Sequence, residues 1–190
     1  MPDWVFNTDT MTFSTKDLEE QKKNRPKINL DIFETKFKRE YWAMFRKYHY
    51  LSHNFNTAAH VFVGFANGQL CAFSAVLPLP HPSAKNIWKF HRTVVFPDYQ
   101  GVGIASAMRA CIADLFLGQG KRITTVTSNR AMIASMQKDK RWICGHIGRL
   151  KTYSATGCMN NYRTNESANR ITASFEYVGD KNINQRGKAR

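Results

Sequence analysis

A short glycine-containing segment, Gln100-Gly101-Val102-Gly103-Ile104-Ala105, has the composition of an anion-binding loop. Its two glycines allow a sharp turn and let a ligand approach the main chain closely. Apolar residues follow at helical spacing, so the segment opens a helix, and the free N–H groups and positive dipole end of a helix start attract negative charge. The segment therefore predicts a site for a pyrophosphate. A dinucleotide-binding loop fits less well because the third glycine of its motif would fall on Ser106.

Residues able to move protons lie near the ends of other predicted elements. His49 and Tyr50 close a predicted helix, and a histidine suits a general base because its pKa lies near neutrality, while the adjacent tyrosine can donate a proton. Arg92 lies in the strand before the glycine segment, and Ser128 ends the strand after it. Each has a structural alternative: His49 and Tyr50 could pack at the end of their helix, and Ser128 could cap the helix that follows it.

Periodic segments around the loop supply the elements that must position these residues. Residues 87–96 are rich in β-branched and aromatic side chains and precede Pro97, which cannot donate to a sheet, so they predict a buried strand. The helix after the loop is expected to end at Gly118 and Gly120. Its predicted apolar face consists of Ile104, Met108, Cys111, Ile112, Leu115 and Phe116.

The rest of the chain alternates between strand and helix patterns. Asn67-Gly68 between two apolar runs is typical of a tight hairpin, and residues 36–50 predict an amphipathic helix with an aromatic stripe. The predicted strands are 27–33, 61–66, 69–77, 87–96, 122–128, 142–150 and 170–178, and a further helix is predicted at 130–138. We expect residues 1–26 to form an irregular N-terminal arm, 27–179 a single domain and 180–190 a basic tail.

The composition favours one globular cytoplasmic domain. A hydrophobic content of 43% and an aromatic content of 13% can build a full core in 190 residues. No apolar run approaches the roughly 20 residues that span a bilayer, and the first residues lack the pattern of a secretory signal. The cysteines, Cys71, Cys111, Cys144 and Cys158, match no zinc module, so we expect reduced thiols and no metal site.

The glycine segment in its context resembles the acyl-CoA signature of the GCN5-related N-acetyltransferase (GNAT) family. That signature places a glutamine or arginine, a later glycine and then a glycine or alanine directly after a strand ending in Val-x-Pro, and here these are Gln100, Gly103 and Ala105. The order of predicted elements over residues 27–178 is also that of the family. The resemblance implies an α/β (α+β) fold: a mixed, mostly antiparallel sheet with splayed central strands and helices on both faces.

The resemblance also implies an acyltransferase that uses acetyl-CoA or another acyl-CoA. The main-chain amides of Gln100, Gly101, Val102, Gly103, Ile104 and Ala105 would hold the CoA pyrophosphate. Val94 and Val95 would pair with the pantetheine arm, and Asn129 would lie beside the cofactor. Many members carry a tyrosine, the acid that protonates the leaving thiolate, about seven positions beyond this asparagine. That position is Met136 here, so the usual acid is missing.

The charge of the chain favours a polyanionic partner. Lys and Arg number 28 against 14 Asp and Glu, which gives a net charge of +14. The residues expected to contact nucleic acid form two groups that would flank the acceptor side of the implied fold. They are Lys36, Lys38, Arg39, Arg46, Lys47, Arg130, Lys140, Arg141 and Arg149. A solvated basic surface that binds nothing specific is the alternative.

Three functions are therefore in competition. His49, Tyr50 and Arg92, with Ser106 or Ser128, resemble residues of the Mom-type phage enzymes, which modify the exocyclic amine of adenine in DNA. That resemblance favours an N-acyltransferase acting on DNA, tRNA or an associated amine. Members of that group are linked to iron, for which His49 and Tyr50 would be the first ligands to test, but the sequence predicts no metal. The other functions are acyl transfer to a small amine or protein lysine, and a non-catalytic basic binding module.

Overall fold

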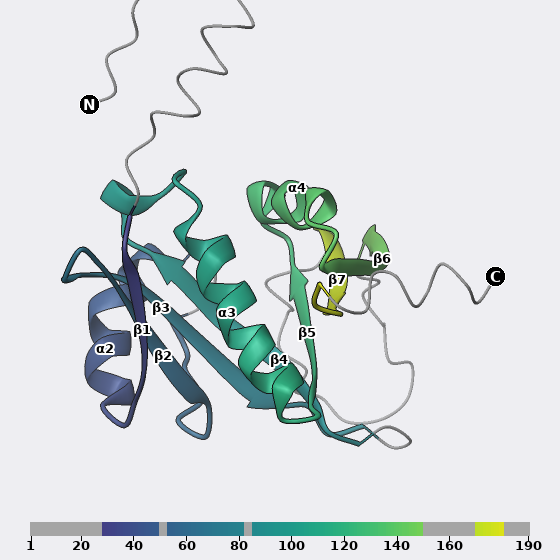
Figure 1. The fold of residues 1–190 in the computed structure, drawn as a ribbon, viewed down its shortest axis with the longest axis horizontal. Coiled ribbons are helices and arrows are strands. Elements are labelled where there is room, and N and C mark those ends of the chain that lie inside the picture. The colour runs from purple at the N-terminus through teal and green to yellow at the C-terminus, as the bar shows by residue number, and fades with distance from the viewer. Residues whose placement is uncertain (1–27, 50–52, 82–84, 150–169, 181–190) are drawn as a thin grey trace, which may run out of the picture.

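The fold is organised around one seven-stranded sheet. The computed structural model describes residues 28–49, 53–81, 85–149 and 170–180, and within them the strands lie in the order β1-β2-β3-β4-β5-β7-β6 (Figure 1). Neighbouring strands are antiparallel except β4 and β5, which are parallel. The strands are β1 (Leu30–Thr35), β2 (His60–Ala66), β3 (Gln69–Pro78), β4 (Ile87–Val95), β5 (Arg122–Thr127), β6 (Trp142–Arg149) and β7 (Ile171–Tyr177). This arrangement confirms the predicted mixed, mostly antiparallel sheet.

Helices cover both faces of this sheet, as the family resemblance implies. They are α2 (Lys38–Phe45), α3 (Ile104–Gly118) and α4 (Arg130–Lys138), with short 3-10 turns η1 (Arg46–Tyr48) and η2 (Pro97–Tyr99). One core cluster joins α3 and α4 to the sheet, and a second joins α2 to the opposite face through Trp42 and Phe45. Because successive residues of a strand point to opposite faces, Val94 belongs to the α2 cluster and Val95 to the α3 cluster.

Local sequence signals explain most element boundaries. Asn67 and Gly68 adopt positive φ values of 49° and 80°, as the tight β2–β3 hairpin requires. The helix predicted over residues 36–50 is wrong in length, since α2 ends at Phe45 and continues only as the 3-10 turn η1. Its apolar stripe is narrower than predicted because Tyr48 is exposed while Trp42 and Phe45 are buried.

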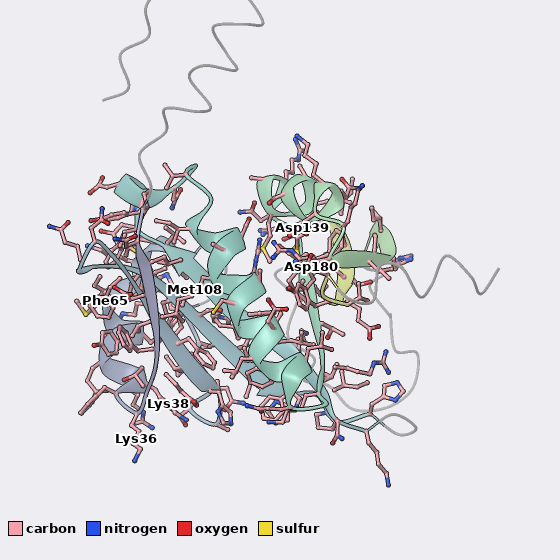
Figure 2. The ribbon with its side chains drawn as sticks, in the orientation of Figure 1. Lys36, Lys38, Phe65, Met108, Asp139 and Asp180 are labelled. Carbon is pink, nitrogen blue, oxygen red and sulfur yellow. The ribbon has the colours of Figure 1, made fainter. Side chains whose placement is uncertain are left out.

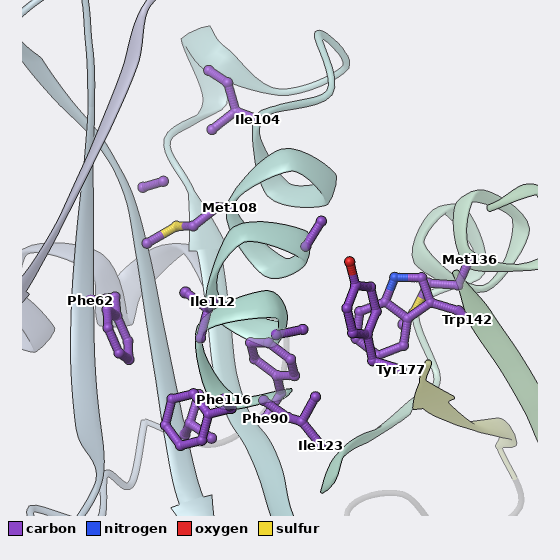
Figure 3. Packing of buried hydrophobic residues seen from close by; sticks show 14 of the residues in the cluster. Phe62, Phe90, Ile104, Met108, Ile112, Phe116, Ile123, Met136, Trp142 and Tyr177 are labelled. Carbon is purple, nitrogen blue, oxygen red and sulfur yellow. The ribbon is translucent and has the colours of Figure 1, made fainter. Parts of the chain in front are cut away.

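The apolar face of α3 also differs from the prediction. Ile104, Met108, Ile112 and Phe116 are buried against the sheet (Figure 3). Cys111 and Leu115, which the periodicity placed on the same face, are exposed, and Arg109 is buried instead. Residues four apart in a helix share a face, and Arg109 is four residues before the buried Ala113. The buried face of α3 is therefore rotated around the helix axis relative to the predicted face.

The two central parallel strands separate part way along their length. Pairing between β4 and β5 covers only Ile87 with Arg122, Trp88 with Ile123, and Lys89 with Thr124. Beyond Lys89 the strands diverge, and α3 and α4 lie on either side of the gap (Figure 1). The splayed strands implied by the resemblance are thus present.

Two further expectations concern the thiols and the membrane. Within the described ranges Cys71 is buried, Cys111 and Cys144 are exposed, and none of these three forms a disulfide, while Cys158 lies outside the described residues. None of the helices in the described part of the chain has the length and apolar character needed to cross a lipid bilayer.

Candidate functional site

The glycine loop is an open cradle at the start of α3. Gly101 and Gly103 have φ values of +83° and +94°, which L-residues rarely adopt, and a Cβ added at either would meet nothing within 4 Å. Gly103 is the N-cap of α3 and has no side chain to cap the helix. The side chain of Gln100 donates from Nε2 to the carbonyl of Val95 over 2.9 Å, which fastens the loop to the end of β4.

This cradle presents unused N–H groups. Ser106 and Ala107 donate their amides to the carbonyl of Gly103, at 3.1 and 3.0 Å. The preceding amides, Val102 to Ala105, have no backbone acceptor within the described residues, as expected for the first turn of a helix. The loop therefore offers both donors and open space to an anion, and it fits the diphosphate that the resemblance implies.

The gap between β4 and β5 lies directly beyond this loop. Thr125 and Thr127 are 2% and 4% exposed and share a face of β5 with the buried Ile123. Val94 and Val95 end β4 and are buried while pairing with β3. Apolar side chains at the end of β4 and buried threonines on β5 thus flank the point where the strands part.

A pocket of about 410 Å³ lies on the α2 face of the sheet. It is lined by Asn54, Phe55, Asn56, Thr57, His91 and Arg92. The ring of Phe55 stacks on Trp42, at 5.5 Å and 28°, and lies 6.0 Å from the ring of His91. Polar side chains and one aromatic edge therefore surround an opening next to the separation of β4 and β5.

A β-bulge in β4 brings His91 and Arg92 together in this pocket. Ala75 of β3 faces Arg92 while Val76 faces Phe90, so His91 is the additional residue on β4. Bulges of this kind redirect side chains, and here both His91 and Arg92 line the pocket. Arg92 donates to the carbonyl of Asn54 over 2.9 Å and so holds the 53–57 loop against β4.

The environment of His91 keeps its imidazole neutral. Partial burial, followed by the positive charges of Arg92 and Lys89 and by His49, lowers the pKa of His91 to about 4. Its Nε2 accepts a long hydrogen bond, 3.4 Å, from the amide of Asn56. With Nε2 as the acceptor, the basic lone pair of the neutral ring lies on this atom and is engaged only by this long hydrogen bond. No local signal in the sequence identifies His91, because the bulge that turns it into the pocket depends on the pairing of β3 with β4.

The four predicted catalytic residues have different surroundings. His49 is 9% exposed and packs edge-on against Trp42, with ring centroids 5.8 Å apart. Tyr50 lies outside the described residues. Arg92 lines the pocket, as described above. Ser128 is partly buried, and the alternative that it caps α4 is wrong, because Asn129 is the cap and its Oδ1 accepts the amide of Met132 at 3.0 Å.

Met136 is part of the core. It is 1% exposed and lies with Trp142 and Tyr177 on the side of α4 that faces α3 (Figure 3). The hydroxyl of Tyr177 donates to Asp114 over 2.8 Å, and burial together with this carboxylate raises the pKa of Tyr177. Neither residue offers an acid near neutral pH.

The predicted nucleic-acid-binding residues divide between the two faces. The first group, Lys36, Lys38, Arg39, Arg46 and Lys47, lies on or next to α2, and Figure 2 shows Lys36 and Lys38 at one end of that helix. Arg130, Lys140 and Arg141 belong to the α4 side, where Arg141 pairs with Asp139 at 2.9 Å, and Arg149 ends β6. Only the first group therefore lies on the same face of the sheet as the pocket.

Comparison with known proteins gives a consistent result. The model of the acetyltransferase (GNAT) family matches residues 24–138. An IAA acetyltransferase from Bacillus cereus is 13% identical with a TM-score of 0.55, covering 78% of this chain and 99% of its own. The ribosomal-protein-S18-alanine N-acetyltransferase from Escherichia coli is 17% identical with a TM-score of 0.55. The match covers 78% of this chain and 93% of that protein. A GNAT family acetyltransferase from Elizabethkingia anophelis with acetyl-CoA bound is 12% identical with a TM-score of 0.54. The match covers 78% of this chain and 97% of that protein. No curated protein matches the chain.

Proposed function

The chain belongs to the acetyltransferase (GNAT) family, and from that premise we propose that it transfers an acyl group from acyl-CoA to a nitrogen of a nucleic-acid base or of a nucleic-acid-associated amine. The observation that carries this proposal is the open glycine cradle at the point where β4 and β5 separate. The cradle supplies donors for a diphosphate, and the strand edges of β4 and β5 beside it are not paired with each other beyond Lys89 and Thr124. The Elizabethkingia anophelis neighbour, which has acetyl-CoA bound, supports acetyl-CoA as the donor.

Acyl-CoA supplies an acyl group activated as a thioester, so that attack by the acceptor nitrogen forms a C–N bond, breaks the C–S bond and releases CoA. Under this proposal the amides of Val102 to Ala105 bind the diphosphate, with Gly101 and Gly103 allowing its close approach. These groups orient the donor and need no rearrangement, because the loop already leaves them unpaired.

We assign the role of general base to His91. The nitrogen that attacks must lose a proton, and the neutral imidazole in the pocket is able to accept it. A pKa near 4 makes His91 a weak base in the free protein, since Arg92 and Lys89 disfavour its protonation. An anionic acceptor in the pocket would offset these charges and raise the pKa of His91. Met136 cannot donate a proton, so the released thiolate takes one from solvent.

The charge around the pocket supports a polyanionic acceptor. Lys89 and Arg92 lie beside His91, and Lys38 reaches the same loop by donating from Nζ to the carbonyl of Thr57 over 3.1 Å. The exposed bases of α2 and η1 extend this positive field over the same face. Such a field steers nucleic acid toward the pocket and holds its phosphates.

A protein amine is the second candidate acceptor. The Escherichia coli neighbour is described as an N-acetyltransferase for an alanine of a ribosomal protein, which is a protein substrate associated with nucleic acid. The exposed bases of α2 and η1 would repel a positively charged acceptor and attract a polyanion, which favours the nucleic-acid acceptor.

One experiment separates these outcomes. Cells expressing the wild-type chain or the His91→Gln variant are analysed by mass spectrometry for modified nucleosides in DNA and tRNA and for acylated protein amines. We expect a modified nucleoside that depends on His91. Acylation of protein alone would overturn the nucleic-acid acceptor, and failure of the purified protein to bind CoA or any acyl-CoA by calorimetry would overturn acyl transfer and leave a basic binding module.

A further inference from the structure

Arg109 is a buried cation that the proposed reaction does not use. It lies on α3, is 3% exposed, and its Nε is fully buried without a hydrogen-bond partner. Within the described ranges no hydrogen bond or ion pair reaches its guanidinium. A charged group removed from water without a partner is strongly unfavourable, so such residues are rare unless a function retains them.

The nearest carboxylate does not neutralise Arg109. Asp139 attracts it electrostatically, and Figure 2 shows Asp139 between α3 and α4. However, both oxygens of Asp139 are bonded to Arg141, whose Nε lies 3.0 Å from Oδ1 and whose terminal nitrogen lies 2.9 Å from Oδ2. Burial lowers the pKa of Arg109 to about 10, and Asp139 opposes this shift only in part. Arg109 therefore remains a cation at neutral pH.

The position of Arg109 along α3 matches the level at which β4 and β5 separate. Phe116 of α3 packs on Trp88 of β4, with ring centroids 5.0 Å apart. Arg109 is two helical turns earlier, about 10 Å along the helix, and a strand covers that distance in about three residues. Because α3 runs antiparallel to β4, Arg109 lies level with His91, just beyond the last β4–β5 pair at Lys89.

The elements that pack around Arg109 carry buried hydroxyl groups. Thr125 and Thr127 are almost inaccessible and point to the α3 side of β5. On α3 itself, Ser106 lies one turn before Arg109 and its hydroxyl is 2.9 Å from that of Ser135 on α4. One buried positive charge and several hydroxyl groups thus lie on the elements around the point where β4 and β5 separate, which suits a small anionic ligand.

We propose that Arg109 binds a carboxylate carried by the acyl group of the donor, so that the protein prefers a dicarboxylic acyl-CoA such as malonyl-CoA or succinyl-CoA to acetyl-CoA. This inference rests on the proposed function. The diphosphate is served by the loop amides at the start of α3, about 8 Å along the helix from Arg109, so the guanidinium is left for a second anion. Its planar donors match a carboxylate in a bidentate pair.

Calorimetry with CoA, acetyl-CoA and succinyl-CoA tests the proposal. We expect the wild-type protein to bind succinyl-CoA at least about tenfold more tightly than acetyl-CoA. Arg109→Met should remove this preference and leave the affinity for acetyl-CoA within about twofold. Arg170→Met, which removes an exposed arginine before β7, is the matched control and should keep the preference. Equal affinities in the wild type would overturn the inference.

Two other outcomes are also informative. An equal loss for all three compounds in Arg109→Met would mean that Arg109 contacts the phosphates of CoA, which overturns the acyl assignment. If the variant does not fold, the preference of the wild type decides the question by itself, and thermal unfolding without ligand reports the fold. Failure of the wild type to bind any of the three would count against the proposed function, whereas binding of all three without preference counts against this inference alone.

Discussion

Replacing Gly103 with alanine separates the strain in the loop from contact with a ligand. The φ of +94° is unfavourable for an L-residue by about 1–2 kcal/mol. No protein atom lies within 4 Å of the added Cβ, so strain is the only expected effect on the free protein. Gly68 in the β2–β3 hairpin has a φ of +80° and equally open surroundings, which makes Gly68→Ala the matched control. For a chain of this length we expect both variants to lower Tm by about 2–8 °C.

The two variants should differ in binding. In Gly103→Ala the methyl group occupies the space through which a diphosphate approaches the amides, so we expect the affinity for acetyl-CoA to fall at least about tenfold, or about 1.4 kcal/mol. Gly68→Ala should bind acetyl-CoA within about twofold of the wild type. Calorimetry measures the affinities and scanning fluorimetry the Tm values. Equal affinities in the two variants would refute the assignment of the loop to the diphosphate.

Four further predictions concern the base, its pH dependence, the core and the charge. His91→Gln should lower kcat/KM by about 10²–10⁴ while Tm stays near that of the wild type, because the glutamine oxygen can still accept the Asn56 amide. Because the pKa of His91 is lowered to about 4, the wild-type kcat/KM should stay flat as pH falls from 7 to 5, and a decline starting near 6.5 would contradict the assigned environment. Met136→Tyr should reduce the free energy of unfolding by about 1–3 kcal/mol through overpacking, and Met136→Leu by less than about 1.5 kcal/mol, as measured by chemical denaturation; the reverse order would show that the site is not tightly packed. Lys47→Glu should weaken binding to a DNA duplex and reduce the slope of log K against log salt by about 0.9, and an unchanged slope would remove η1 from the interface.

Elements with strong local signals were predicted well from the sequence. The hairpin at Asn67-Gly68 and the strand β5 lie where turn residues and a β-branched run predict them, and α4 has the predicted bounds although its cap is Asn129 and not Ser128. The helix before residue 50 was predicted too long, because aromatic spacing continues past Phe45 while the backbone changes to a 3-10 turn. The parallel pairing of β4 with β5 has no local signature and was implied only by the family resemblance.

The site was predictable only in part. The loop from Gln100 to Ala105 was identified because its function depends on main-chain conformation, which glycine spacing reveals directly. His91 and Arg109 were not identified, since their roles depend on a bulge and on burial, and both are set by tertiary contacts. The part played by His49, Tyr50 and Ser128 stays a prediction.

The separation of β4 and β5 explains why these features occur together. A sheet that stops pairing in its interior leaves strand edges without ladder partners, and buried backbone groups must find partners elsewhere. The chain meets part of this need itself, because the side chain of Gln100 bonds the carbonyl of Val95 at the open end of β4. The remaining edge groups, the loop amides and the guanidinium of Arg109, which lack partners within the described residues, lie near the point where this pairing ends. A ligand that carries amides along its length and anionic groups at its two ends would satisfy all three at once, and a CoA thioester of a dicarboxylic acid has that composition.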